Sequence, residues 1–314
     1  MDKITVVGAG RVGESTAQIL AQQEMCRELV LLDIREGIAE GVALDIQETA
    51  PLFGFDTRVS GSSGAEAITG SQLVVITAGL PRKPGMSRSD LLDTNAAIVR
   101  GTVDHVLRLA PQAMILVVSN PVDVMTYEAW RHSGWDRRRV FGLSGVLDAA
   151  RMAHFIARET GISVMDVTAM VLGGHGDSMV PMPRYSTIHG IPIAHFLHPD
   201  AIERIMERTR HGGAEILALK KTSSANDSPA AAIAAMVDAV VYDRKRVLPC
   251  VALLDGEYGL RDVAMGVPCV VGRGGIGQVI GLPLTEHEQQ SFTRSAESVR
   301  GDIQRLKSAA SGAN

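Results

Sequence analysis

The sequence predicts an α/β protein in which a doubly wound parallel sheet is followed by an α+β domain. Two observations carry this prediction. Up to about residue 145, short runs rich in β-branched residues alternate with segments of helical periodicity, which is the order that parallel sheets with right-handed crossovers require. Those runs are apolar throughout, as is typical of strands covered on both faces. The alternation stops after residue 145, so we expect domains over residues 1–145 and 146–314.

In the first domain, predicted strands and helices follow one another regularly. The apolar runs that predict strands are Lys3–Gly8, Glu28–Ile34, Leu73–Gly79 and Met114–Pro121. Periods close to 3.6 residues predict helices between them, over Val12–Gln23, Gly37–Ala50 and Asp90–Leu109. Each predicted helix therefore connects two parallel strands.

The second domain mixes helices and strands without that alternation. Helical periods cover Leu147–Glu159, Asp200–Leu219, Pro229–Val240 and a charged closing segment, Thr285–Lys307. One strand is predicted over Val167–Leu172, just before His175, and others over Val247–Leu253 and Cys269–Val271. This order favours an α+β arrangement.

Composition excludes several classes of function. A chain of 314 residues with 46% hydrophobic residues can bury sizeable cores, and its net charge of −4 gives no basic field for a nucleic-acid partner. No apolar run approaches the roughly eighteen residues of a membrane span, and the first residues lack a secretory signal. The three cysteines are odd in number and lack metal-ligand spacing. We therefore expect a soluble cytoplasmic protein with no nucleic-acid partner, no membrane partner and no metal.

A glycine motif follows the first predicted strand and opens the first helix. It has the form G-x-G-x-x-G and consists of Gly8, Ala9, Gly10, Arg11, Val12 and Gly13. The second predicted strand ends in Asp33, about twenty residues later, where a dinucleotide-binding fold carries an acid for the adenosine ribose hydroxyls. Together these features predict a Rossmann domain. A carboxylate at Asp33 repels a 2′-phosphate, so the expected cofactor is NAD rather than NADP.

The same glycine pattern occurs again at Gly272–Gly277. Gly281 and Pro283 prevent a long helix after it, and no second strand with a terminal acid follows. We interpret this copy as a turn rather than a binding loop.

His175 lies among three glycines, at the point where a predicted strand ends. Such a place suits an imidazole that a ligand must approach closely. Asp148 and Arg151 lie three residues apart on one predicted helix and so share a face. Reduction of an α-keto acid needs a nicotinamide, a proton donor that titrates near neutrality, an acid to orient that donor, and a guanidinium for the carboxylate. The sequence offers each of these.

Two further polar segments follow strands at the carboxyl edge of the sheet, where doubly wound folds bind ligands. Residues 79–90 combine Pro and Gly with Arg82, Lys83 and Arg88. We expect this segment to act as a lid that brings arginines over an anion. Asn120 ends the strand at Met114–Pro121, where it serves either as a ligand contact or as a turn-forming residue.

These motifs resemble the lactate/malate dehydrogenase family over essentially the whole chain. VVGAGRVG, LLDI, ITAGLPRKPGMSR, NAAIV, VVSNPVD, GVLDAARM and GGHGDSMVP appear in family order and with family spacing. The chain is most similar to the lactate-dehydrogenase-like group of malate dehydrogenases. One departure is the polar Asn226-Asp227-Ser228, where the family commonly carries bulky or aromatic residues.

The resemblance implies a role for each residue. His175 would accept the proton in malate oxidation and Asp148 would orient it. For the substrate, Arg151 would hold the C1 carboxylate, Arg88 would polarise the C2 carbonyl, and Asn120 would bond its oxygen. Arg82 would meet the distal carboxylate. Asn95 and the backbone of Val118, Ser119 and Asn120 would join the glycine motif and Asp33 in binding NAD.

The resemblance also implies a homo-oligomer, either a tetramer or a dimer, that acts on malate and oxaloacetate. A lactate or other 2-hydroxy-acid dehydrogenase on the same scaffold is the alternative. Position 82 separates the two, because a lactate enzyme is expected to carry glutamine there and this chain carries Arg82. A dinucleotide-binding protein without chemistry is disfavoured by the intact His175, Asp148 and Arg151.

Overall fold

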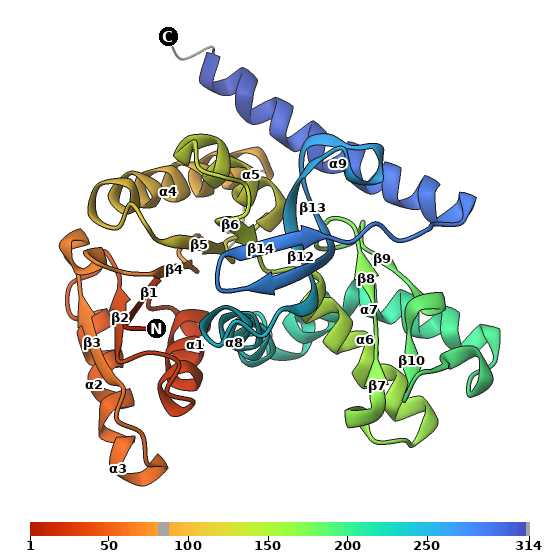
Figure 1. Ribbon diagram of the computed structural model, residues 1–314, viewed down its shortest axis with the longest axis horizontal. Coiled ribbons are helices and arrows are strands. Elements are labelled where there is room, and N and C mark those ends of the chain that lie inside the picture. Colours follow the sequence, from red (N-terminus) through yellow and green to blue (C-terminus); the bar gives the residue numbers. More distant parts are fainter. Residues whose placement is uncertain (81–87, 312–314) are drawn as a thin grey trace.

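The computed structural model describes residues 1–80 and 88–311, and the side chains of residues 1–80 and 90–308 (Figure 1). Its centre is a nine-stranded sheet of order β14-β13-β12-β6-β5-β4-β1-β2-β3. Six of these strands are parallel and belong to the first half of the chain. They are β1 (Lys3–Val7), β2 (Glu28–Leu32), β3 (Arg58–Ser62), β4 (Leu73–Ile76), β5 (Met114–Val117) and β6 (Val140–Gly142). Their order, 3-2-1-4-5-6, is that of the Rossmann fold, so the predicted fold class is confirmed.

Helices connect the parallel strands and cover the sheet. Two of them, α4 and α5, pack against each other, while α1 packs beside α8 from the second half (Figure 1). The helices of the first half are α1 (Arg11–Gln22), α2 (Ile38–Glu48), α3 (Ala50–Phe53), α4 (Arg88–Leu109) and α5 (Val122–Ser133). Strands β1, β4 and β5 are buried almost completely, in agreement with their apolar sequences.

The sheet does not stop at the expected domain boundary. Strand β12 (Arg246–Asp255) pairs antiparallel with β6, and β13 (Arg261–Gly272) and β14 (Gly275–Val279) extend it. The second glycine motif forms the turn between β13 and β14, where Gly275 has φ +85°. Strands β12 and β13 are longer than predicted. Pro249 lies opposite Pro268 in their register, and proline makes a sequence look unlike a strand.

The remaining helices and short strands come from the second half of the chain, where α6 packs against α7, α8 against α1, and α9 against β13 and α5. These helices are α6 (Gly145–Thr160), α7 (Pro199–Lys220), α8 (Asp227–Val241) and α9 (Glu286–Ser311). The short strands are β7 (Val167–Thr168), β8 (Val171–Leu172), β9 (Val180–Pro181), β10 (Thr187–Ile188) and β11 (Ile191–Pro192). Short 3₁₀ turns are η1 (Ala65–Ile68), η2 (Val164–Asp166), η3 (Pro183–Tyr185), η4 (Ile193–His195) and η5 (Glu257–Gly259).

The single strand predicted over Val167–Leu172 is wrong in one respect. The chain leaves one small sheet and enters another within this run, because β7 pairs with β10 whereas β8 pairs with β9. Ala169 and Met170 lie between the two pieces. The run still ends directly before the Gly173–Gly176 segment that carries His175.

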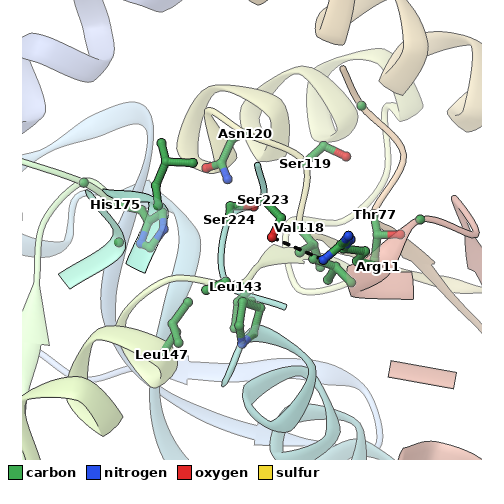
Figure 2. Close-up of a pocket in the computed structure, with 18 of the residues that line it drawn as sticks. Arg11, Thr77, Val118, Ser119, Asn120, Leu143, Leu147, His175, Ser223 and Ser224 are labelled. Carbon is green, nitrogen blue, oxygen red and sulfur yellow. Dashed lines mark hydrogen bonds between the residues drawn. The ribbon is translucent and has the colours of Figure 1, made fainter. Parts of the chain in front are cut away.

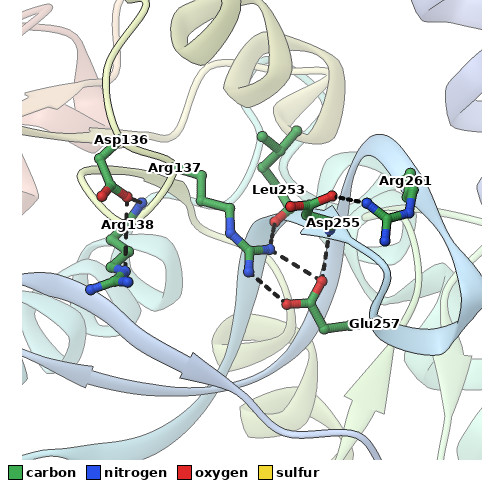
Figure 3. Close-up of polar contacts among 7 residues, drawn as sticks. All are labelled: Asp136, Arg137, Arg138, Leu253, Asp255, Glu257 and Arg261. Atoms are coloured by element: carbon green, nitrogen blue, oxygen red, sulfur yellow. Dashed lines mark hydrogen bonds and ion pairs between the residues drawn. The ribbon is translucent and has the colours of Figure 1, made fainter.

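A half-buried ion pair joins the two halves at β12. The guanidinium of Arg137, just before β6, donates to both carboxylate oxygens of Glu257 at 2.8 and 3.1 Å and to the carbonyl of Leu253 at 2.9 Å (Figure 3).

Within the described residues, no helix is both long and apolar enough to cross a membrane.

Candidate active site

A cleft of about 700 Å³ lies where the carboxyl ends of the parallel strands meet the second half of the chain (Figure 2). It contains the glycine turn at one end and His175 at the other. Residues from both halves line it, among them Gly10, Arg11, Val12, Gly13, Thr77, Asn95, Val118, Ser119, Asn120, Leu143, Leu147, Arg151, His175, Ser223 and Ser224. The sheet edge that was expected from sequence therefore faces one shared space.

Steric contacts explain two glycines of the first motif, Gly8 and Gly13, whereas Gly10 faces open space. At Gly8, where φ is +103°, an added Cβ would lie 2.7 Å from the backbone nitrogen of Ala78. At Gly13 it would lie 1.9 Å from the carbonyl oxygen of Gly8, so only glycine lets α1 approach β1. A Cβ at Gly10 would meet nothing within 4 Å. The open side at Gly10 leaves the backbone accessible at the N-terminus of α1, where helices bind anions.

Asp33 follows β2 directly and is held by two kinds of donor. Its Oδ2 accepts from the backbone N–H of Ala9 at 3.0 Å. The guanidinium of Arg35 donates to both its oxygens, at 2.9 and 3.1 Å. The hydrogen bonds from Arg35 lower the pKa of Asp33 despite partial burial. Asp33 is therefore an anion beside the glycine turn, and its carboxylate is paired with the guanidinium of Arg35.

Asn95 joins the loops that follow β4 and β5. Its Oδ1 accepts from the backbone N–H of Leu80 at 2.8 Å, and its Nδ2 donates to the carbonyl of Asn120 at 2.8 Å. Ser119 donates to the carbonyls of Ile76 and Ala78. These bonds fix the backbone of Val118–Asn120 along the cleft wall.

His175 and Asp148 form a pair at the other end of the cleft. Nδ1 of His175 lies 2.8 Å from Oδ2 of Asp148, and because a carboxylate only accepts, Nδ1 carries the proton. Nε2 is therefore left for a ligand. Burial by itself lowers the pKa of His175, but the charge and hydrogen bond of Asp148 outweigh it and raise the pKa above the usual 6.5.

Arg151 is the third member of this group. Its Nη1 lies 3.2 Å from Oδ1 of Asp148, and its Nε is buried without a hydrogen-bond partner among the described residues. Two consecutive glycines of α7 make room for it: a Cβ at Gly212 would lie 3.2 Å from Cδ of Arg151, and one at Gly213 would lie 3.7 Å from Nη2. Sequence reasoning missed this pair, although glycine inside a helical period is itself a signal.

Some expected site residues have side chains outside the part of the chain that the structure describes. Arg82 and Lys83 fall outside the described residues. Arg88 begins α4, but its side chain is also outside them, so the expected lid is not described.

The polar segment that departs from the family pattern has partners on α1. The Nδ2 of Asn226 lies 3.1 Å from Oγ of Ser15, and Nη1 of Arg11 lies 3.2 Å from Oγ of Ser223 (Figure 2). The start of α8 is therefore tied to the helix of the glycine motif by polar contacts rather than by aromatic packing.

The family models for this chain divide it in two. Residues 2–142 match the lactate/malate dehydrogenase NAD binding domain, and residues 145–310 match the lactate/malate dehydrogenase alpha/beta C-terminal domain.

Individual relatives agree with the models. The malate dehydrogenase of Thioalkalivibrio sulfidiphilus is 69% identical, over 98% of this chain and 100% of the relative. A solved malate dehydrogenase from Salinibacter ruber superposes with a TM-score of 0.95 at 43% identity, over 99% of this chain and 100% of that one. A lactate dehydrogenase from Cryptosporidium parvum, complexed with lactic acid and NAD, gives 0.94 at 36% identity, over 98% of each chain. With models that cover nearly its full length and relatives of this similarity, the chain belongs to the lactate/malate dehydrogenase family.

Proposed function

We propose that this protein is an NAD-dependent malate dehydrogenase that oxidises (S)-malate to oxaloacetate reversibly, with His175 as the proton acceptor. The observation that carries the proposal is the His175–Asp148 pair at 2.8 Å, in the same cleft as the glycine turn. The match to a malate dehydrogenase at 69% identity supports this substrate.

The residues at the glycine turn fit a dinucleotide. Gly10 offers an open backbone at the N-terminus of α1 for the pyrophosphate, and Asp33 offers an anionic acceptor for ribose hydroxyls. Arg11, beside them, adds a positive charge. The polypeptide at this end of the cleft therefore selects NAD, as the NAD-binding family model also indicates.

The proton chemistry belongs to His175. When bound, NAD supplies the acceptor for the hydride that leaves C2 of malate. Nε2 of His175 takes the proton of the C2 hydroxyl, while Asp148 keeps the proton on Nδ1 and stabilises the imidazolium that results. In oxaloacetate reduction the protonated His175 returns this proton to the oxygen.

The substrate carboxylates need cations. Arg151, on the same helix face as Asp148, is proposed to bind the C1 carboxylate with its guanidinium. Arg88 and Asn120 are proposed to contact the C2 oxygen, and Arg82 the distal carboxylate that distinguishes oxaloacetate from pyruvate. These last assignments rest on the family resemblance.

The deciding experiment is the decrease of NADH absorbance with purified protein. Oxaloacetate should be reduced with a kcat/KM far above that for pyruvate. A preference for pyruvate would favour the alternative of a lactate dehydrogenase, since a solved lactate dehydrogenase superposes on this chain with a TM-score of 0.94. Absence of turnover with any 2-keto acid, together with retained NADH binding, would favour a binding protein without chemistry.

We also propose that the chain forms a homo-oligomer, a dimer or tetramer, in the cytoplasm. Helices α2 and α3 expose large apolar side chains, including Leu52 at 83% and Phe53 at 60%, which favours a protein contact. The three cysteines are buried free thiols, a state that a reducing compartment maintains. Multi-angle light scattering tests the subunit count.

We further propose that the chain divides functionally at about residue 145, into an NAD-binding part and a substrate-binding part, although one continuous sheet runs through both.

A further inference from the structure

A second carboxylate, that of Asp123, contacts the backbone of His175, and the proposed reaction gives it no role. Asp123, in the first turn of α5, is only 3% exposed. Its Oδ2 accepts a hydrogen bond from the backbone N–H of His175 at 2.8 Å. Its Oδ1 is buried and has no hydrogen-bond partner among the described residues.

The segment around His175 depends on side chains for its shape. Its backbone is left-handed at Gly173 (φ +89°) and Gly176 (φ +117°). The N–H of Gly174 donates to Oγ of Ser295 on α9 at 2.8 Å, and the next N–H, that of His175, donates to Asp123. Two side chains from different helices therefore hold two consecutive amides, and Asp123 is the one bonded to the histidine itself.

The charge of Asp123 needs an explanation beyond this hydrogen bond. An asparagine oxygen would accept from His175 equally well without the cost of burying an anion. Among the described residues, three charged groups act on the imidazole: Asp148 and Arg151 on α6, and Asp123 on α5. Asp177, which is 90% exposed and pairs with His211, and Arg210 on α7 line the same cleft. Of these, Asp123 and Asp148 are the two buried carboxylates bonded to His175.

We propose that Asp123 is a positioning residue that fixes the His175 backbone through Oδ2 and stabilises the imidazolium through its negative charge. The inference rests on the proposed role of His175. Burial raises the pKa of Asp123 to about 6, while Asp148 holds the pKa of His175 above 6.5. Above about pH 6, Asp123 therefore carries a negative charge beside His175.

Asp123→Asn tests the charge while it keeps an acceptor for the His175 amide. We expect the alkaline limb of kcat/KM for oxaloacetate reduction to move down by roughly 0.5–1 pH unit, with NADH binding unchanged. Asp123→Ala also removes the hydrogen bond, and kcat should fall by a further factor of about 10 or more, since misplacement of a reacting group is costly. If Asp123→Asn does not fold, Asp123→Ser is smaller and equally neutral.

Glu128→Gln is the matched control. Glu128 is a buried carboxylate on the same helix, but its ion partners are Arg100 and Arg131 rather than His175. This variant should lower the melting temperature without moving the pH profile. An Asp123→Asn profile that coincides with wild type would overturn the proposal.

A direct titration separates this inference from the proposed function. Histidine-selective ¹³C NMR, with His175 assigned by substitution, measures the pKa of its imidazole without substrate. A lower pKa in Asp123→Asn supports the role of the charge even if wild type fails to reduce oxaloacetate. An unchanged pKa rejects it even if the enzyme is fully active.

Discussion

Nδ1 of His175 lies 2.8 Å from Oδ2 of Asp148, a carboxylate with 1% of its side chain exposed. Oδ1 of the same carboxylate faces Nη1 of Arg151 at 3.2 Å. One buried group therefore links the proposed proton carrier to the proposed carboxylate binder. Because both bonds go to Asp148, its substitution should affect proton transfer and substrate binding together.

Asp148→Asn should lower kcat/KM for oxaloacetate by roughly 10²-fold or more, the range of general acid catalysis. The amide is neutral, so the pKa of His175 should fall and the alkaline limb of the pH profile should move to lower pH. Steady-state rates between pH 5 and 10 measure both effects. Asp104→Asn is the control, because Asp104 pairs with His132 at 2.7 Å on the surface. Equal losses in both variants would contradict the assignment.

Gly212→Ala should raise KM for oxaloacetate several-fold with less effect on kcat. Its Cβ would lie 3.2 Å from Cδ of Arg151, and the arginine must give way. Alanine also favours the helix by about 1 kcal/mol over glycine, so the protein should not lose much stability. Gly101→Ala, inside α4 with nothing within 4 Å, is the matched control and should leave KM unchanged. An unaltered KM in Gly212→Ala would mean that Arg151 has room to spare.

The parts of the fold that the sequence predicts correctly have local causes. The glycine motif can be recognised from its spacing, because a Cβ at Gly13 would lie 1.9 Å from the carbonyl oxygen of Gly8 in the same turn. Strands β1, β2, β4 and β5 are apolar runs, and burial on both faces requires that pattern.

The parts that sequence reasoning missed depend on contacts between distant segments. Strand β3 is an edge strand with a single apolar residue, Val59, besides Gly61, and β6 has only three residues. Gly61 in β3 packs against the backbone of Ala39, where a Cβ would lie 2.1 Å from its carbonyl carbon. The contact of Asp123 with His175 spans 52 residues. The periodicity of a single segment does not indicate which distant segment it contacts.

Asp33→Ser should raise the ratio of kcat/KM for NADPH to that for NADH by about tenfold or more. The substitution removes the acid that repels a 2′-phosphate and frees Arg35, now bonded to both oxygens of Asp33, to pair with it. A charge-assisted hydrogen bond is worth about 1.5–3 kcal/mol. The double variant Asp33→Ser/Arg35→Ala should lose most of the gain. The same ratio in both variants would show that Arg35 does not reach the phosphate.

Glu257→Gln should reduce the free energy of unfolding at pH 7 by roughly 1–2 kcal/mol, because a partly buried bidentate pair with Arg137 is lost (Figure 3). Burial opposes ionisation, but the bonds from Arg137 lower the pKa of Glu257 from 4.5 to about 2. Its contribution is therefore present above pH 4.5 and is lost as pH falls toward 2, where wild type and variant should converge. Urea denaturation at pH 7, 4 and 2.5 measures this. Asp255→Asn, which breaks the exposed pair with Arg261, should change little.

Arg82→Gln should lower kcat/KM for oxaloacetate and raise it for pyruvate. Oxaloacetate carries a second carboxylate, and taking that group out of water without a cation leaves a buried charge unpaired, which costs several kcal/mol. With pyruvate bound, Arg82 itself lacks a partner, so the wrong substrate is rejected for two reasons.

The kcat/KM for each substrate should change by about ten- to a hundredfold, since a charge-assisted hydrogen bond contributes roughly 1.5–3 kcal/mol. The ratio of the two kcat/KM values should change by more. Arg82→Lys should retain only part of the selectivity, because lysine lacks the planar fork of the guanidinium. Steady-state kinetics of the three proteins with both keto acids decide the matter. If the oxaloacetate-to-pyruvate ratio of Arg82→Gln equals that of wild type, another residue reads the distal carboxylate.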